Sequence, residues 1–101
     1  MLNLSELKNK RYELLWFDET TIQLKKPTQQ MWERLGELRN IDSNDLKVLM
    51  DIVYELLYEI FNNNANGRKF SKEEIKENFD LDIAYEFMNE YAKHYIPQLG
   101  K

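Results

Sequence analysis

The sequence predicts an α+β fold that is mostly α, in which a short N-terminal β-hairpin of two or three strands packs on a bundle of about four helices. Three observations predict it: two short segments rich in β-branched and aromatic residues near the N-terminus, a proline directly after them, and apolar residues at helical spacing from there on. Because the chain has 101 residues and a mass of 12.3 kDa, we expect a single domain, with a hairpin region at 1–26 and a helical region at 27–101.

The predicted hairpin joins RYELLWF (11–17) to TIQLK (21–25) across a polar break at 18–20 that is typical of a turn. Strand alternation places the apolar residues of both segments on one face, namely Tyr12, Leu14, Trp16, Ile22 and Leu24. A two-stranded hairpin is marginally stable in water, so this face is expected to pack on helices. Three earlier leucines suggest a short third strand, namely Leu2, Leu4 and Leu7.

Pro27 and Thr28 predict the start of the first helix, because proline cannot continue a strand ladder and threonine can cap a helix. This helix is expected to end near Arg39. It carries an apolar stripe that can dock on the next helix, formed by Met31, Trp32, Leu35 and Leu38. After a connector at 40–44, either Asp42 or Ser43 is expected to cap the central helix.

The central helix is predicted at 46–61, LKVLMDIVYELLYEIF, where the polar residues form a single stripe. That stripe consists of Lys47, Asp51, Glu55 and Glu59. The opposite side is the expected core and consists of Leu46, Leu49, Ile52, Val53, Leu56, Leu57 and Ile60. The remaining arc is an aromatic flank formed by Met50, Tyr54, Tyr58 and Phe61. A domain of this size has little material to cover that flank, so we expect a partner to cover it.

Two further sets of capping residues follow the central helix. Residues 62–67, NNNANG, predict its end, since Asn and Gly tolerate the left-handed conformation. Ser71 followed by Glu74 is typical of a capping box, and Phe70 and Ile75 stand where a hydrophobic staple places its two apolar residues. A short helix is therefore expected to begin directly after Ser71.

The last helix is predicted between its cap, Asp80, and about Tyr95, before Pro97. Its main apolar face consists of Leu81, Ala84, Tyr85, Met88, Tyr91, Ala92 and Tyr95. A second stripe on the same helix consists of Ile83, Phe87 and His94. Together with the flank of the central helix, it predicts a partner-binding surface of Met50, Tyr54, Tyr58, Phe61, Ile83 and Phe87. Aromatic residues at helical spacing are equally typical of a core, so both interpretations stand.

The composition excludes several classes of protein. Without cysteine, the chain has no disulfide, thiolate nucleophile or sulfur metal site. A formal net charge of -4 and a pI near 5.0 disfavour nucleic acid, whose binding depends on neutralising phosphates. The central helix carries a charge at every turn, well short of the roughly 20 apolar residues of a membrane span, and the N-terminus lacks a signal-peptide pattern. We therefore expect a cytoplasmic protein that needs no cofactor and binds neither membrane nor nucleic acid.

Residues 62–73 fit the N-x-N-x-N-G-x5-E spacing of a helix-flanked calcium loop, with side-chain oxygens at Asn62, Asn64, Asn66 and Glu73. This loop has a single carboxylate, however, and Lys69 stands where such loops have an apolar residue. A helix stop that leads into a capping box explains the same residues. No metal site is therefore predicted.

His94 is the only histidine, and no nucleophile motif accompanies it. An enzymatic alternative would rest on His94 and on the acidic stripe of the central helix, whose carboxylates we expect to face solvent or a basic partner. No catalytic residue is predicted, and the chain is expected not to be an enzyme.

The order of these parts resembles that of tail assembly chaperones of long-tailed, siphovirus-type bacteriophages. The resemblance covers most of the chain. It rests on Tyr12-Glu13-Leu14 in a short β N-terminus, the Pro27-Thr28 helix entry, and the long apolar helix that ends in NNNANGRKFSKEEIKENFDLD (62–82). It continues in the last helix and just beyond it, at Tyr85, Phe87, Tyr91 and Ile96.

The resemblance implies a non-enzymatic chaperone that coats the phage tape-measure protein in the host cytoplasm and helps recruit tail-tube subunits. Such a chaperone self-associates and is absent from the mature virion. Many members are also made in a longer, frameshifted form, and this chain would correspond to the short one. No individual residue receives a role from the resemblance. The alternative is a small helical regulatory or immunity-type protein that binds and blocks one folded protein target as a monomer.

Overall fold

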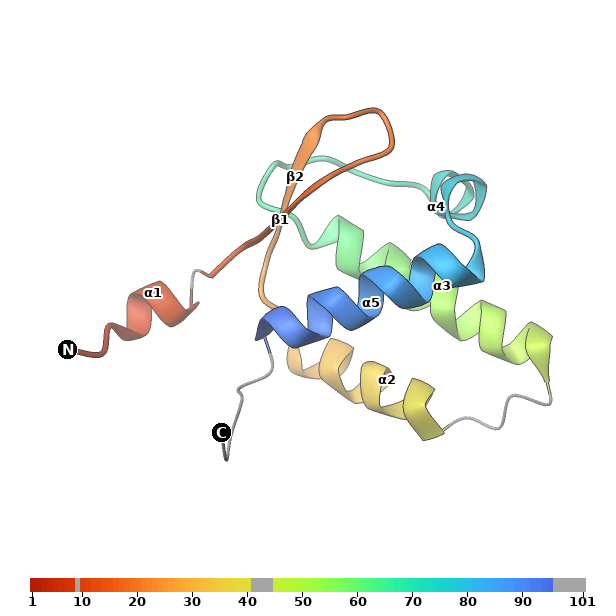
Figure 1. The fold of residues 1–101 in the computed structure, drawn as a ribbon, viewed down its shortest axis with the longest axis horizontal. Helices are drawn as coiled ribbons and strands as arrows, with labels where there is room; N and C mark the ends of the chain where they lie inside the picture. The colour runs from red at the N-terminus through yellow and green to blue at the C-terminus, as the bar shows by residue number, and fades with distance from the viewer. Residues whose placement is uncertain (9, 41–44, 96–101) are drawn as a thin grey trace.

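The computed structural model describes residues 1–8, 10–40 and 45–95 (Figure 1). In these ranges the chain forms a two-stranded antiparallel hairpin and five helices, which confirms the predicted α+β, mostly α, fold class. The elements in chain order are α1 (Leu4–Lys8), β1 (Tyr12–Leu15), β2 (Thr21–Leu24), α2 (Gln29–Asn40), α3 (Leu46–Asn62), α4 (Lys72–Asn78) and α5 (Leu81–Tyr95).

Helix α3 is the centre of the fold, and α2, α4 and α5 all pack against it. The hairpin lies over the C-terminal end of α3, and α1 projects away from the rest of the molecule (Figure 1). The core joins hairpin and helices in one cluster, whose fully buried side chains include Ile22, Leu24, Val53, Leu56, Leu57, Ile60, Phe61, Ile75 and Tyr91. Helices therefore cover the apolar face of the hairpin, as expected because a two-stranded hairpin by itself is only marginally stable in water.

The hairpin brings the predicted apolar residues together on one face, with Tyr12 opposite Leu24 and Leu14 opposite Ile22. Its turn contains Glu19 at a φ of 68°, and the N–H of Glu19 donates to the carbonyl of Trp16 over 2.8 Å. The far edge of β2 also has a partner, because Leu24 forms a β-bridge with Asn64 of the segment after α3. That segment takes the position beside the hairpin that a third strand would occupy.

The expected N-terminal third strand is wrong, because residues 4–8 form α1. The side-chain oxygen of Asn3 accepts the N–H groups of Ser5, at 3.0 Å, and Glu6, at 3.3 Å, which caps this helix. Leu2 and Leu4 are exposed rather than paired with the hairpin. A local cap thus determines the structure of a segment whose leucine spacing also fits a strand.

Helices α2 and α3 follow the predicted boundaries closely. The Thr28 hydroxyl accepts the N–H of Met31 at 3.2 Å and caps α2. The observed cap of α3 is Asp45, whose carboxylate accepts the N–H of Val48 at 3.2 Å, whereas the predicted caps Asp42 and Ser43 lie outside the described residues.

Most of the predicted core side of α3 is buried, at Leu49, Val53, Leu56, Leu57 and Ile60. Ile52 is half-buried. The prediction is wrong for Leu46, which is 56% exposed in the first turn of the helix.

The two C-terminal helices begin as predicted. The Ser71 hydroxyl accepts the N–H of Glu74 at 3.0 Å, and the staple residues Phe70 and Ile75 are both buried. The Asp80 carboxylate accepts the N–H of Ile83 at 2.8 Å and caps α5. On the main apolar face of α5, Tyr85 alone is exposed, at the edge toward α2.

Candidate protein-binding surfaces

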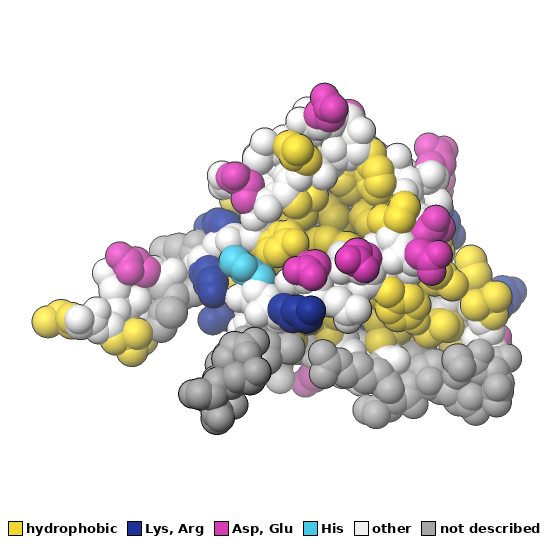
Figure 2. All heavy atoms as spheres, viewed as in Figure 1, with side chains coloured by type: hydrophobic (Ala, Val, Ile, Leu, Met, Phe, Trp, Pro, Cys, Tyr) yellow, Lys and Arg dark blue, Asp and Glu magenta, His cyan; other side chains and the backbone are white. Residues whose placement is uncertain are grey.

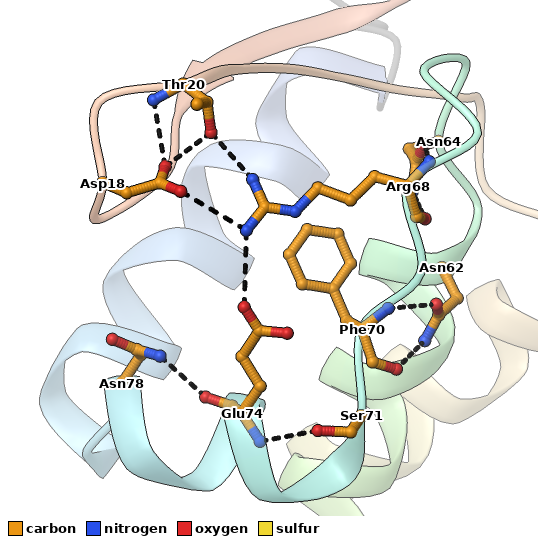
Figure 3. Close-up of polar contacts among 9 residues, drawn as sticks. All are labelled: Asp18, Thr20, Asn62, Asn64, Arg68, Phe70, Ser71, Glu74 and Asn78. Carbon is orange, nitrogen blue, oxygen red and sulfur yellow. Dashed lines mark hydrogen bonds and ion pairs between the residues drawn. The ribbon is translucent and has the colours of Figure 1, made fainter.

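The asparagines of the calcium-like loop bond to the main chain. Asn64 is buried; its amide donates to the carbonyls of Phe61 and Arg68, and its oxygen accepts the N–H groups of Asn66 and Arg68, all within 3.0 Å. The oxygen of Asn62 accepts the N–H of Phe70 at 2.8 Å (Figure 3). Among the described residues, no cluster of three or more His, Cys, Asp or Glu is arranged to hold a metal. The loop therefore joins the end of α3 to the start of α4.

Arg68 connects that loop to the hairpin turn (Figure 3). Its guanidinium donates to the Thr20 hydroxyl at 2.8 Å and pairs with Asp18 at 3.5 Å and Glu74 at 3.3 Å. It also lies over the Phe70 ring, 4.7 Å from the ring centroid. Hydrogen bonds from Thr20 to Asp18, with help from the Arg68 charge, lower the pKa of the Asp18 carboxyl. These contacts make Arg68 a structural junction.

The aromatic flank of α3 is largely covered by the chain itself. Phe61 is 1% exposed, with Trp16 at 5.1 Å and Phe70 at 5.7 Å between ring centroids, so it is a core residue and not a surface residue. The Tyr54 hydroxyl donates to the carbonyl of Phe79 at 2.7 Å. Tyr58 and Met50 are half-buried, and the ammonium of Lys72 lies 5.3 Å from the Tyr58 ring centroid.

The acidic stripe of α3 finds basic neighbours within the chain. Glu59 pairs with Arg34 of α2, and Glu55 pairs with Lys72 at the start of α4 at 2.7 Å. Asp51 is exposed. Two of these three carboxylates thus pair with basic residues of α2 and α4, whereas we expected the stripe to face solvent or a basic partner; only Asp51 is exposed as expected.

The second stripe of α5 does form a surface feature. Ile83 and Phe87 line a shallow crevice of about 430 Å³ together with Tyr12 of β1, whose ring meets that of Phe87 edge-on at 6.2 Å. The same crevice is lined by Asp82, Glu86 and Glu90, which stand four residues apart along α5. Figure 2 shows hydrophobic side chains gathered between the hairpin and α5, with acidic side chains along the helix.

The charge of this crevice comes from its carboxylates. Burial raises the pKa of the Tyr12 phenol, and the nearby Glu90 charge raises it further, so the hydroxyl stays protonated at neutral pH. Ile83 is 41% exposed and Phe87 is half-buried. The crevice thus offers an apolar floor next to a row of negative charges, which suits an apolar segment that also carries Lys or Arg.

His94 lies near the crevice, where the hairpin meets the end of α5. Its ring is 5.1 Å from that of Tyr12, and its Nε2 atom is 3.1 Å from the main-chain oxygen of Arg11. The His94 ring therefore packs against the start of β1 and helps to hold the hairpin against α5.

A second hollow lies between α2 and α5. It is an apolar groove of about 330 Å³, lined by Trp32, Leu35, Gly36, Leu38, Tyr85, Met88, Asn89 and Ala92. Both helices pack on α3. Gly36 and Ala92 have little or no side chain, which leaves space between the two helices. We call this hollow the α2/α5 groove.

Sequence reasoning identified Ile83 and Phe87 but not Tyr12 or the acidic row beside them. The row had a readable signal, because residues four apart lie on one side of a helix and Asp82, Glu86 and Glu90 flank the apolar stripe. The approach of Tyr12 depends on how the hairpin docks on α5. The α2/α5 groove depends likewise on the spacing of two helices that are far apart in sequence.

Comparisons of the chain with protein-family models, with curated proteins and with solved structures find no match. Over the described part of the chain, no helix combines the length and the apolar character needed to cross a membrane.

Proposed function

We propose that this chain is a non-enzymatic chaperone of phage tail assembly, which binds the tape-measure protein and keeps its helices soluble. The observation that carries the proposal is the crevice between β1 and α5, with its apolar floor and its row of carboxylates. An amphipathic client helix would place its apolar residues against Ile83 and Phe87 and its basic residues against the acidic row. The tape-measure assignment is supported by the sequence resemblance alone.

The distribution of apolar surface also supports a binding function. Exposed large apolar side chains on the hairpin and α5 include Leu15, Phe17, Ile83 and Tyr85. Contiguous apolar surface in a small protein marks interaction sites, and a negative net charge of the kind seen here limits nonspecific aggregation of the chaperone itself. In the host cytoplasm such a protein would coat its client, help recruit tail-tube subunits, self-associate, and be left out of the virion.

The test is co-expression of the chain with fragments of the tape-measure protein encoded by the same phage. We expect the chain to keep the fragments in the soluble fraction and to co-purify with them. Ile83→Ser should weaken the measured affinity by about tenfold, because it removes an exposed apolar side chain from the crevice floor. Leu46→Ser is the matched control, since Leu46 is similarly exposed at the start of α3 and lies outside the crevice.

A second measurement separates the two proposed contributions to binding. Glu86→Lys should weaken the interaction and reduce its dependence on salt, because it reverses a charge in the acidic row. If the fragments stay insoluble, or if Ile83→Ser and Leu46→Ser bind equally well, the proposal fails. A tight one-to-one complex with a single folded protein would favour the regulatory or immunity-type alternative.

A further inference from the structure

We propose that the crevice between β1 and α5 selects its client by the position of basic residues: it takes a helix that carries Lys or Arg at every fourth position along one flank of its apolar stripe. The inference rests on the proposed function, in which this crevice binds an amphipathic helix, and it names the feature that separates a client from other apolar helices. Three properties of the described residues support it: a small apolar floor, a regular row of unpaired carboxylates on one wall, and an opposite wall without charge.

The apolar floor of the crevice is too small to choose between clients by itself. It consists mainly of Ile83, which is 41% exposed, and of Phe87, which is half-buried and already packs against the rings of Phe61 and Tyr91. The free energy of burial follows the apolar area removed from water, so any helix with an apolar stripe gains about the same from this floor. Discrimination between clients therefore depends on the polar part of the crevice.

The acidic row gives one wall of the crevice a regular charge pattern. Asp82, Glu86 and Glu90 are all exposed and stand four residues apart on α5, where Figure 2 shows acidic side chains along the helix. At a rise of about 1.5 Å per residue, successive carboxylates stand roughly 6 Å apart along the helix axis. A client helix alongside α5 presents cations at the same interval when Lys or Arg recurs at every fourth position. Each cation can then meet one carboxylate.

The row has no cation of its own within the described part of the chain. The ion pairs found there engage carboxylates of the hairpin turn, α3 and α4, and none engages the row. Lys93 follows Glu90 by three residues on α5, yet no ion pair joins the two. Like charges four residues apart on a helix repel each other. A client that brings cations to the row relieves this repulsion, whereas Glu55 and Glu59 of α3 already have basic neighbours in the fold.

The opposite wall of the crevice carries no charge. It is formed by Tyr12 of β1, whose hydroxyl stays protonated at neutral pH, and the row supplies all the charged side chains among the described residues that line the crevice. Cations on the other flank of a client would therefore face no carboxylate. Basic residues are required on one flank only, which distinguishes the selected pattern from a helix that is merely cationic.

The test compares synthetic helices that share one apolar stripe and a fluorescent label, each about 18 residues long so that it can form a helix in isolation. The matched helix has Lys at every fourth position beside the stripe. The displaced helix has the same composition, with its Lys residues on the side opposite the stripe. The neutral helix has Gln in place of Lys. By fluorescence anisotropy with the full chain, we expect the matched helix to bind about tenfold more tightly than either of the others, with the steepest dependence on salt.

Substitutions in the row locate the effect. Glu86→Gln should weaken binding of the matched helix several-fold and leave the neutral helix unaffected, because it removes the central charge of the row. Glu77→Gln is the matched control, since it makes the same change of charge at an exposed position of α4 outside the crevice. Glu86→Lys should bind a matched helix whose central Lys is replaced by Glu, because the pair is then restored with its charges exchanged. Circular dichroism checks that each variant is folded.

The outcomes distinguish this inference from the proposed function. Equal binding of the matched and displaced helices, together with weaker binding by Ile83→Ser, would overturn the charge selection and retain the crevice as a binding site. Equal effects of Glu86→Gln and Glu77→Gln would also overturn the selection, because the net charge of the chain would then attract the client. Binding of no helix, or binding that Ile83→Ser leaves unchanged, would overturn both proposals.

Discussion

The hairpin edge of the molecule and its α2/α5 side differ in the side chains that lie between neighbouring elements. At the hairpin edge, Asn64 and Arg68 bond the end of α3, the turn of the hairpin and the start of α4 to one another. On the α2/α5 side, Gly36 and Ala92 leave an apolar groove. Polar side chains thus close one side of the fold, and small side chains leave a groove on the other side.

The largest loss of stability is expected from Asn64→Ala at the hairpin edge. The buried Asn64 side chain bonds four main-chain groups, one at a buried and three at part-buried positions, and its loss leaves all four without this partner. We expect a loss of roughly 3 kcal/mol in the free energy of unfolding, measured by urea denaturation. Lys69→Ala, at an exposed site in the same loop, should change stability by no more than about 0.5 kcal/mol. Equal effects of the two substitutions would show that Asn64 does not hold the edge together.

A smaller loss is expected from Arg68→Lys. Lysine keeps the charge but lacks the planar fork that reaches Thr20 and Glu74 together and lies over Phe70. The free energy of unfolding should fall by about 1 kcal/mol, because the site is partly exposed. An unchanged free energy of unfolding would show that the planar guanidinium is not needed at this junction.

The smallest expected effect is a gain in the free energy of unfolding, from a substitution in the α2/α5 groove. Gly36→Ala should raise the free energy of unfolding by roughly 0.5 to 1 kcal/mol, because glycine is unfavourable inside a helix and the new methyl group has room. Urea denaturation measures the change. A fall in the free energy of unfolding would show that the groove has no room for the added methyl group.

Local signals in the sequence predicted a large part of this fold. Thr28, Ser71 and Asp80 cap the helices as expected, because a cap depends on the residue itself and on the N–H groups that follow it. The shared apolar face of the hairpin followed from strand alternation. The same reasoning failed at residues 4–8, where a leucine spacing compatible with a strand gave no sign of the cap at Asn3.

The candidate surfaces were less accessible to sequence reasoning. Helical periodicity divides α3 into arcs but does not say which arc the returning chain will cover. Phe61 was assigned to a partner surface, yet Trp16 of the hairpin and Phe70, just before α4, pack against it and leave it 1% exposed. Ile83 was assigned to the same surface and does line a crevice. The difference arises from tertiary placement, which a single helix pattern does not contain.

The pairing of β2 on both edges has a consequence for expression at high concentration. An unpaired strand edge is a template for fibril growth, since its free N–H and C=O groups recruit strands from other molecules. Here the N–H of Lys25 donates to Asn63 and the N–H of Ala65 donates to Gln23, which occupies the edge of β2 that faces away from β1. Although the protein exposes apolar side chains, it therefore has one fewer unpaired strand edge from which amyloid could grow at high concentration.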